Sequence, residues 1–310
     1  MKPFLLLGLI MILARSCGSG SETQQKPVVS VTILPQKFFV EKLAGSSVGI
    51  NVMVPPGASP ATYEPSVQQL RNLEHSPLYL KIGYVEFELG WMGKIAASNP
   101  SMKIVDLSEG VDLSSVEPLA ERSRPFKAPA QSATGSPAPA PAHADHSHSG
   151  ADPHIWMSAR NARIIARNTC DALVTLFPEF ADSINLHLEQ LLKEIDSVDL
   201  TISNLLGPYR NGAFMIYHPA LTYYARDYHL NQYSLETEGK TPSPKHMQWM
   251  VDLGKEENIT AIFVQKQFDQ RNASVLAGEI GARVIRIDPL SANWSAEMIH
   301  IAEQLKASFE

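Results

Sequence analysis

The stretch that decides the fold spans residues 178–207 and reads PEFADSINLHLEQLLKEIDSVDLTISNLLG. Its apolar residues recur in alternating steps of four and three, the spacing of one face of an α-helix; they are Ile184, Leu188, Leu191, Ile195, Val198, Ile202 and Leu205. At about 1.5 Å per residue this helix is roughly 40 Å long, more than the thickness of one lobe. We therefore interpret residues 181–207 as a rigid helix linking two lobes. A helix lying on one sheet and a coiled-coil dimer are the alternatives.

Strand patterns alternate with helix patterns on both sides of this linking helix, which predicts mostly parallel sheets. The strand candidates are residues 28–34, 48–54, 78–82 and 103–107 before it, and 213–217, 232–235, 259–264 and 283–287 after it. The predicted fold class is α/β, with an N-terminal lobe at residues 28–180 and a C-terminal lobe at residues 208–310. Such a chain is typical of a binding protein whose site lies in the cleft between its lobes.

The amino terminus predicts export. Met1 to Ala14 is a short, largely apolar run that is too short to cross a bilayer as a mature helix, so residues 1–17 are interpreted as a signal peptide. The run leads into Leu13-Ala14-Arg15-Ser16-Cys17-Gly18, which resembles a lipoprotein cleavage site with Cys17 as the lipidated residue. Ordinary cleavage nearby is the alternative. Residues 18–27 then form a flexible tether.

Composition excludes a general polyanion binder, because 26 basic and 32 acidic residues give a net charge of -6. No nucleic-acid partner is therefore expected. Residues 124–150 are rich in Pro, Ala and Ser without an apolar period, which predicts a mobile loop. This loop ends with His143, His146 and His148, either an auxiliary weak metal site or a solvated linker.

Three polar residues follow apolar strands or open a helix where the lobes are expected to meet. His154 lies in Asp152-Pro153-His154-Ile155-Trp156, with Asp152 available as an acceptor for its ring, while His218 and Asp288 come directly after strand candidates. Carboxyl ends of parallel strands face the ligand crevice, so these side chains are expected to converge. Two imidazoles and a carboxylate suit zinc above all. The alternatives are structural histidines and an Asp288 that caps a helix.

These motifs resemble the zinc and manganese solute-binding proteins of bacterial ABC importers, from Val28 to the end of the chain. The resemblance is carried by Pro56-Gly57-Ala58-Ser59-Pro60 with Tyr63-Glu64-Pro65, by the segment around His154, by Tyr217-His218-Pro219-Ala220, and by Arg286-Ile287-Asp288-Pro289-Leu290. It implies lobes joined by one rigid helix and a periplasmic, monomeric protein, not an enzyme, that captures metal and delivers it to a permease and its ATPase.

The same resemblance implies four metal ligands, of which this chain matches His154, His218 and Asp288. Ala61 stands where the family usually has a fourth, a histidine. The site then has three protein ligands and a water, or Glu64 or a loop histidine completes it; Glu64 alternatively caps the next helix. An imidazole at position 218 resembles the zinc branch, so Zn²⁺ is expected, with Mn²⁺ as the alternative.

Two rival functions remain at this stage. A metallohydrolase would use the open metal position for an activated water, but the chain has no His-Glu-x-x-His helix. A metal chaperone or adhesin on the same fold is the other.

Overall fold

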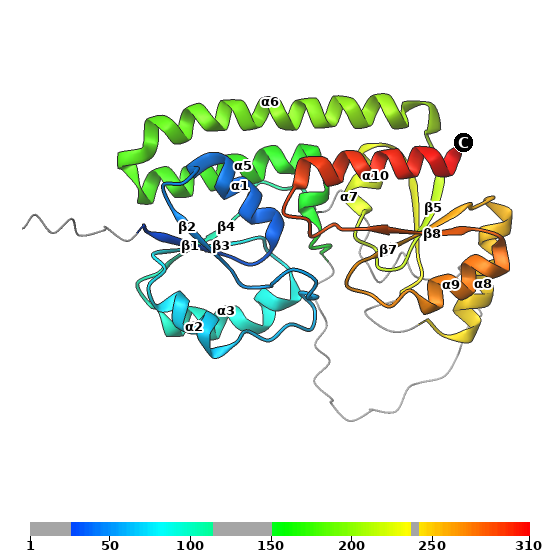
Figure 1. Ribbon diagram of the computed structural model, residues 1–310, viewed down its shortest axis with the longest axis horizontal. Coiled ribbons are helices and arrows are strands. Elements are labelled where there is room, and N and C mark those ends of the chain that lie inside the picture. Colours follow the sequence, from blue (N-terminus) through cyan, green and yellow to red (C-terminus); the bar gives the residue numbers. More distant parts are fainter. Residues whose placement is uncertain (1–25, 114–150, 237–241) are drawn as a thin grey trace, which may run out of the picture.

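The computed structural model describes residues 26–113, 151–236 and 242–310 and contains two α/β lobes side by side. One long helix, α6 (Ala181–Leu206), runs across the top of both lobes in Figure 1. The cleavage site at Cys17, the predicted tether up to residue 25 and the three loop histidines lie outside the described residues. In the part of the chain that the structure describes, no helix has the length and apolar character needed to cross a membrane.

The first lobe is built on a parallel four-stranded sheet in the order β2-β1-β3-β4. Its elements in chain order are β1 (Val28–Val31), α1 (Leu34–Ala44), β2 (Gly49–Val52), α2 (Val67–Glu74), β3 (Leu78–Lys81), α3 (Glu86–Ser98) and β4 (Lys103–Asp106). Helices α2 and α3 lie on one side of the sheet and α1 on the other (Figure 1). The first strand is shorter than predicted, because α1 already begins at Leu34 with Pro35 in its first turn.

The second lobe repeats this plan with the parallel order β6-β5-β7-β8. Its elements are β5 (Ala213–Ile216), α7 (Thr222–Asp227), β6 (Asn231–Ser234), α8 (Pro244–Glu256), β7 (Ala261–Gln265), α9 (Arg271–Ile280), β8 (Arg283–Ile287) and α10 (Trp294–Phe309). Strand β7 lies between β5 and β8, so the residues that follow these three strands meet at one edge of the sheet.

The lobes are joined by a helical segment that comprises η2 (Ile155–Met157), α5 (Ala159–Leu176), η3 (Pro178–Phe180), α6 and η4 (Gly207–Tyr209). Helix α6 packs against α1 and α5 of the first half and against α10 of the second. Its predicted seam is the buried face, with Ile184, Leu191, Ile195, Val198 and Ile202 all at most 3% exposed. The prediction of one long helix between two parallel-sheet lobes is thus confirmed.

The side chains of two tryptophans form hydrogen bonds that link the segment before α5 to the second lobe. The Trp156 indole N–H donates to the carbonyl of Pro289 at 2.8 Å, and the Trp294 indole N–H donates to the carbonyl of Trp156 at 2.7 Å. Both rings are about 2% exposed, so their apolar surfaces and their single polar atoms are buried and satisfied together. The chain around His154 is therefore held rigidly against the loop that follows β8.

Candidate metal centre

His218 stands just beyond β5 and is fixed by residues at the carboxyl ends of the two neighbouring strands. Its backbone N–H donates to Gln265 Oε1 at 3.3 Å, and Gln265 Nε2 donates to the His218 carbonyl at 2.5 Å. Its ring Nδ1 lies 2.8 Å from Glu236 Oε2, two residues past β6. The ring also stacks on Phe268, with centroids 5.2 Å apart. Backbone and ring are therefore both oriented by the carboxyl edge of the sheet.

His154 is fixed in the same way by a carboxylate of its own segment. Asp152 Oδ1 accepts from the backbone N–H of His154 at 2.9 Å and lies 2.8 Å from its ring Nδ1. The Asp152 side chain is fully buried, and its carbonyl accepts from the Tyr223 hydroxyl at 3.1 Å. The predicted acceptor role of Asp152 follows from this geometry: a buried carboxylate holds the ring in one orientation.

The two imidazoles point their remaining nitrogens at each other. Because Nδ1 of each ring faces a carboxylate, Nε2 is the nitrogen left for a ligand, and the two Nε2 atoms are 3.3 Å apart. Two nitrogens bound to one tetrahedral zinc at about 2.0–2.1 Å are separated by about 3.3–3.4 Å. The spacing is therefore that of two ligands of one zinc ion.

Asp288 is engaged elsewhere. Its Oδ2 accepts from Lys266 Nζ at 2.9 Å, and its Oδ1 lies 3.5 Å from Gln267 Nε2. Its backbone N–H donates to Glu297 Oε1 at 2.7 Å. The alternative role as a helix cap is wrong, since Asn293 caps α10.

The first lobe offers less than predicted at this point. Glu64 and Ala61 are exposed in the loop before α2. Glu64 does not cap that helix, because Ser66 is the N-cap and shares a capping box with Gln69. Across residues 26–113, 151–236 and 242–310, no group of three or more His, Cys, Asp or Glu side chains is placed to hold a metal ion. The structure brings His154 and His218 together and adds neither Asp288 nor Glu64 to them.

Two supporting residues escaped the sequence analysis. Glu236 directly follows the strand candidate 232–235, so its place at the sheet edge was visible in the sequence, whereas its pairing with His218 depends on the order of the strands. Gln265 was assigned no role, because an amide at a strand end carries no signal of its own.

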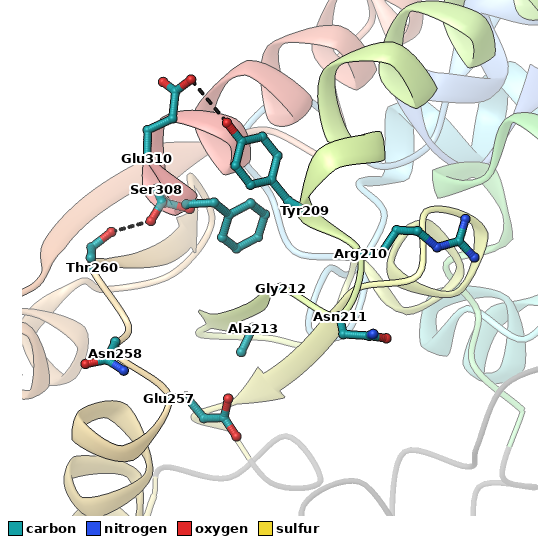
Figure 2. A pocket seen from close by; sticks show the side chains of 11 residues that line it. Tyr209, Arg210, Asn211, Gly212, Ala213, Glu257, Asn258, Thr260, Ser308 and Glu310 are labelled. Atoms are coloured by element: carbon teal, nitrogen blue, oxygen red, sulfur yellow. Dashed lines mark hydrogen bonds between the residues drawn. The ribbon is translucent and has the colours of Figure 1, made fainter.

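A separate hollow of about 510 Å³ lies at the opposite edge of the second sheet, at the amino ends of β5 and β7. Figure 2 shows its rim, where the Tyr209 hydroxyl donates to Glu310 at 3.2 Å and the Thr260 hydroxyl donates to the Ser308 carbonyl at 2.6 Å. It contains no histidine or cysteine and belongs to the wrong end of the strands for the predicted site.

Comparison with known proteins identifies the family of this chain. The family described as "Zinc-uptake complex component A periplasmic" (ZnuA) matches residues 29–308. The chain belongs to this family. A crystal structure of ZnuA superposes with a TM-score of 0.79 at 31% identity and covers 92% of this chain and all of that one. The periplasmic zinc-binding protein TroA from Treponema pallidum, at 16% identity and a TM-score of 0.74 over 91% of this chain and 99% of its own, shares the fold.

A further relative is a putative metal-binding protein of Chlamydia trachomatis, 24% identical over 96% of this chain and 97% of its own length. Membership of the ZnuA family makes this chain a periplasmic, metal-binding component of metal ABC transport. Such components work with an ABC permease and its ATPase and are solute-binding proteins, not enzymes, so the metallohydrolase alternative is excluded.

Proposed function

We propose that this ZnuA-family chain captures Zn²⁺ in preference to Mn²⁺ between His154 and His218 and delivers it to a membrane permease. The observation that carries the proposal is the pair of Nε2 atoms 3.3 Å apart, each on a ring whose Nδ1 is held by a carboxylate. Imidazole nitrogens suit zinc, whereas manganese prefers carboxylate and carbonyl oxygens.

The two carboxylates support this choice. In many zinc sites a ligating histidine donates its other N–H to a carboxylate, which fixes the tautomer and raises the basicity of the ligating nitrogen. Asp152 and Glu236 stand in this relation to His154 and His218, with side chains 0% and 7% exposed. Burying two His–carboxylate pairs that face each other costs free energy, because polar and charged groups lose their hydration. A cation bound between them offsets that cost.

Asp288 is proposed as the third ligand, reached after its carboxylate leaves Lys266, with water in the fourth position. Glu64 is the alternative for that position. His143, His146 and His148 are proposed to handle metal weakly from outside the described residues. A lipid on Cys17 and a monomeric state complete the proposed arrangement at the membrane.

Zinc titration of single variants tests the site. Zinc dissociation constants, measured by competition with a chromogenic chelator, are expected to rise at least about tenfold for His154→Ala and for His218→Ala, or about 1.4 kcal/mol. His300→Ala, which removes an exposed histidine of α10, is the matched control and is expected to bind as the wild type. Unchanged affinity in both site variants would remove the proposed centre, and tighter binding of Mn²⁺ than of Zn²⁺ by the wild type would overturn the proposed metal.

A further inference from the structure

Three consecutive residues, Gln265, Lys266 and Gln267, contact both His218 and Asp288 at the carboxyl edge of the second sheet. The first of them ends β7 and the other two follow it. Gln265 braces the backbone of His218 on one side. Lys266 and Gln267 contact the carboxylate of Asp288 on the other, at 2.9 and 3.5 Å. Because β7 lies between β5 and β8, this short segment connects the histidine that follows one neighbour with the carboxylate that follows the other.

Of the two contacts to the Asp288 carboxylate, the one from the Lys266 ammonium is the stronger. It approaches Oδ2 at 2.9 Å, within charge-assisted hydrogen-bond distance, and the Asp288 side chain is only 19% exposed. Glu297 keeps the backbone beside this carboxylate in place through its 2.7 Å bond from the Asp288 N–H. The carboxylate predicted to bind the metal is therefore already neutralised by a cation of the chain itself.

The lysine end of this pair is open to solvent, with 59% of its side chain exposed. An ion pair with so exposed a partner is weak, because solvent screens it. It therefore reduces the affinity of a competing cation by about fivefold at most, and a divalent metal held by two imidazoles can displace it.

We propose that Lys266 is a specificity-determining residue, an intramolecular cation that competes with the bound metal for the Asp288 carboxylate. This inference rests on the proposed function of the His154 and His218 pair. Lys266 lowers the affinity of the site for every divalent ion that takes the Asp288 carboxylate. The loss is largest for Mn²⁺, because zinc can stay bound through the two imidazoles with the Lys266–Asp288 pair intact, whereas manganese prefers oxygen ligands and has to break the pair. Selectivity for zinc then comes partly from withholding an oxygen ligand.

The test compares Lys266→Gln with Lys255→Gln, which removes the same charge from an exposed position on α8. Dissociation constants for Mn²⁺ and Zn²⁺ are measured by chelator competition in both variants, in Asp288→Asn and in the Lys266→Gln/Asp288→Asn double variant. Lys266→Gln is expected to bind Mn²⁺ about fivefold tighter, or about 1 kcal/mol, and Zn²⁺ about twofold tighter, while Lys255→Gln is unchanged.

The gain is expected to vanish in the Asp288→Asn background, since no carboxylate is then left to release. A gain that persists there, or an equal gain in Lys255→Gln, would mean a general effect of charge and would overturn the proposal, as would no gain at all. Higher salt is expected to narrow the difference between wild type and Lys266→Gln, because an exposed pair is screened.

His154→Ala, titrated in parallel, separates the two levels. If it binds metal as tightly as the wild type, the proposed site itself is wrong; if it loses affinity while Lys266→Gln does not change it, only the role of Lys266 is wrong.

Discussion

The two lobes place a carboxylate at the same edge of the same kind of sheet and use it in opposite ways. In the first lobe Glu88 is 3% exposed and accepts from the backbone N–H groups of Ile82 at 2.8 Å and Gly83 at 2.7 Å. It also accepts from the Thr32 hydroxyl, which follows β1. In the second lobe Glu236 contacts the ring of His218, whose other nitrogen remains available to a ligand.

The difference shows what a parallel sheet does and does not determine. Strand order brings polar groups to the carboxyl edge in both lobes. At the first edge the chain satisfies its own carboxylate with backbone donors, so this acid is part of the structure. At the second edge an imidazole stands between the carboxylate and the outside, and the hydrogen bond orients a nitrogen towards a ligand.

The largest expected effect is a pH dependence of the unfolding free energy, caused by Glu88 at the carboxyl edge of the first sheet. Burial, opposed by the hydrogen bonds from Thr32, Ile82 and Gly83 and by Lys81, raises the pKa of Glu88 from 4.5 to about 7. Because the folded protein holds this proton more tightly than the unfolded chain, the contribution of Glu88 to stability is fully present below pH 4.5 and is lost as the pH rises to about 7. The difference in pKa corresponds to roughly 3 kcal/mol.

Urea unfolding of wild type and Glu88→Gln between pH 4.5 and 8 measures this effect. Glutamine cannot titrate, so the stability advantage of the wild type over the variant is expected to shrink as the pH rises through this window. Subtracting the two proteins removes the contributions of all other titrating groups. An advantage that stays constant or grows with pH would contradict the assigned pKa.

The same substitution in the two lobes gives the sharpest comparison for metal binding. Glu236→Gln is expected to weaken zinc binding about 10- to 100-fold, because a neutral amide neither fixes the tautomer of His218 nor raises its basicity. Glu88→Gln is expected to leave the zinc dissociation constant unchanged. Titration of both variants at one pH decides, and equal losses would mean that the two edges are not used differently.

The sequence predicted the architecture well because periodicity reports it directly. The bounds of β8 are as predicted, and the apolar steps from Ile184 onward mark the buried face of α6. His154 and His218 were predicted to converge because each stands where an ordered segment ends or begins, a position that strand and helix patterns reveal.

The supporting contacts could not be predicted in the same way. Glu88 has the sequence context of an acidic residue in the first turn of a helix, and only the placement of α3 buries it beneath Thr32. Asp288 was predicted as a ligand from its position after β8, but nothing in the sequence shows that Lys266, more than twenty positions earlier, pairs with it. Such contacts depend on strand order and side-chain direction, which a single sequence does not contain.

The smallest expected effect comes from adding a zinc-binding side chain to the first lobe at position 61. Ala61 is exposed in the loop that connects β2 to α2, and its backbone N–H is 3.3 Å from Ser59 Oγ, so the loop has a defined turn in which to carry a larger side chain. Ala61→His is expected to tighten zinc binding about two- to tenfold, up to about 1.4 kcal/mol, because an imidazole replaces a water that was itself a ligand. Thr62→His, at the exposed neighbouring position, is the control and is expected to bring no gain.

Glu64→Gln, measured alongside, tests whether Glu64 is already a metal ligand. If Glu64→Gln weakens zinc binding while Ala61→His adds nothing, Glu64 already supplies the donor. The first lobe would then reach the metal through a carboxylate that lies exposed, away from His154 and His218, in this structure.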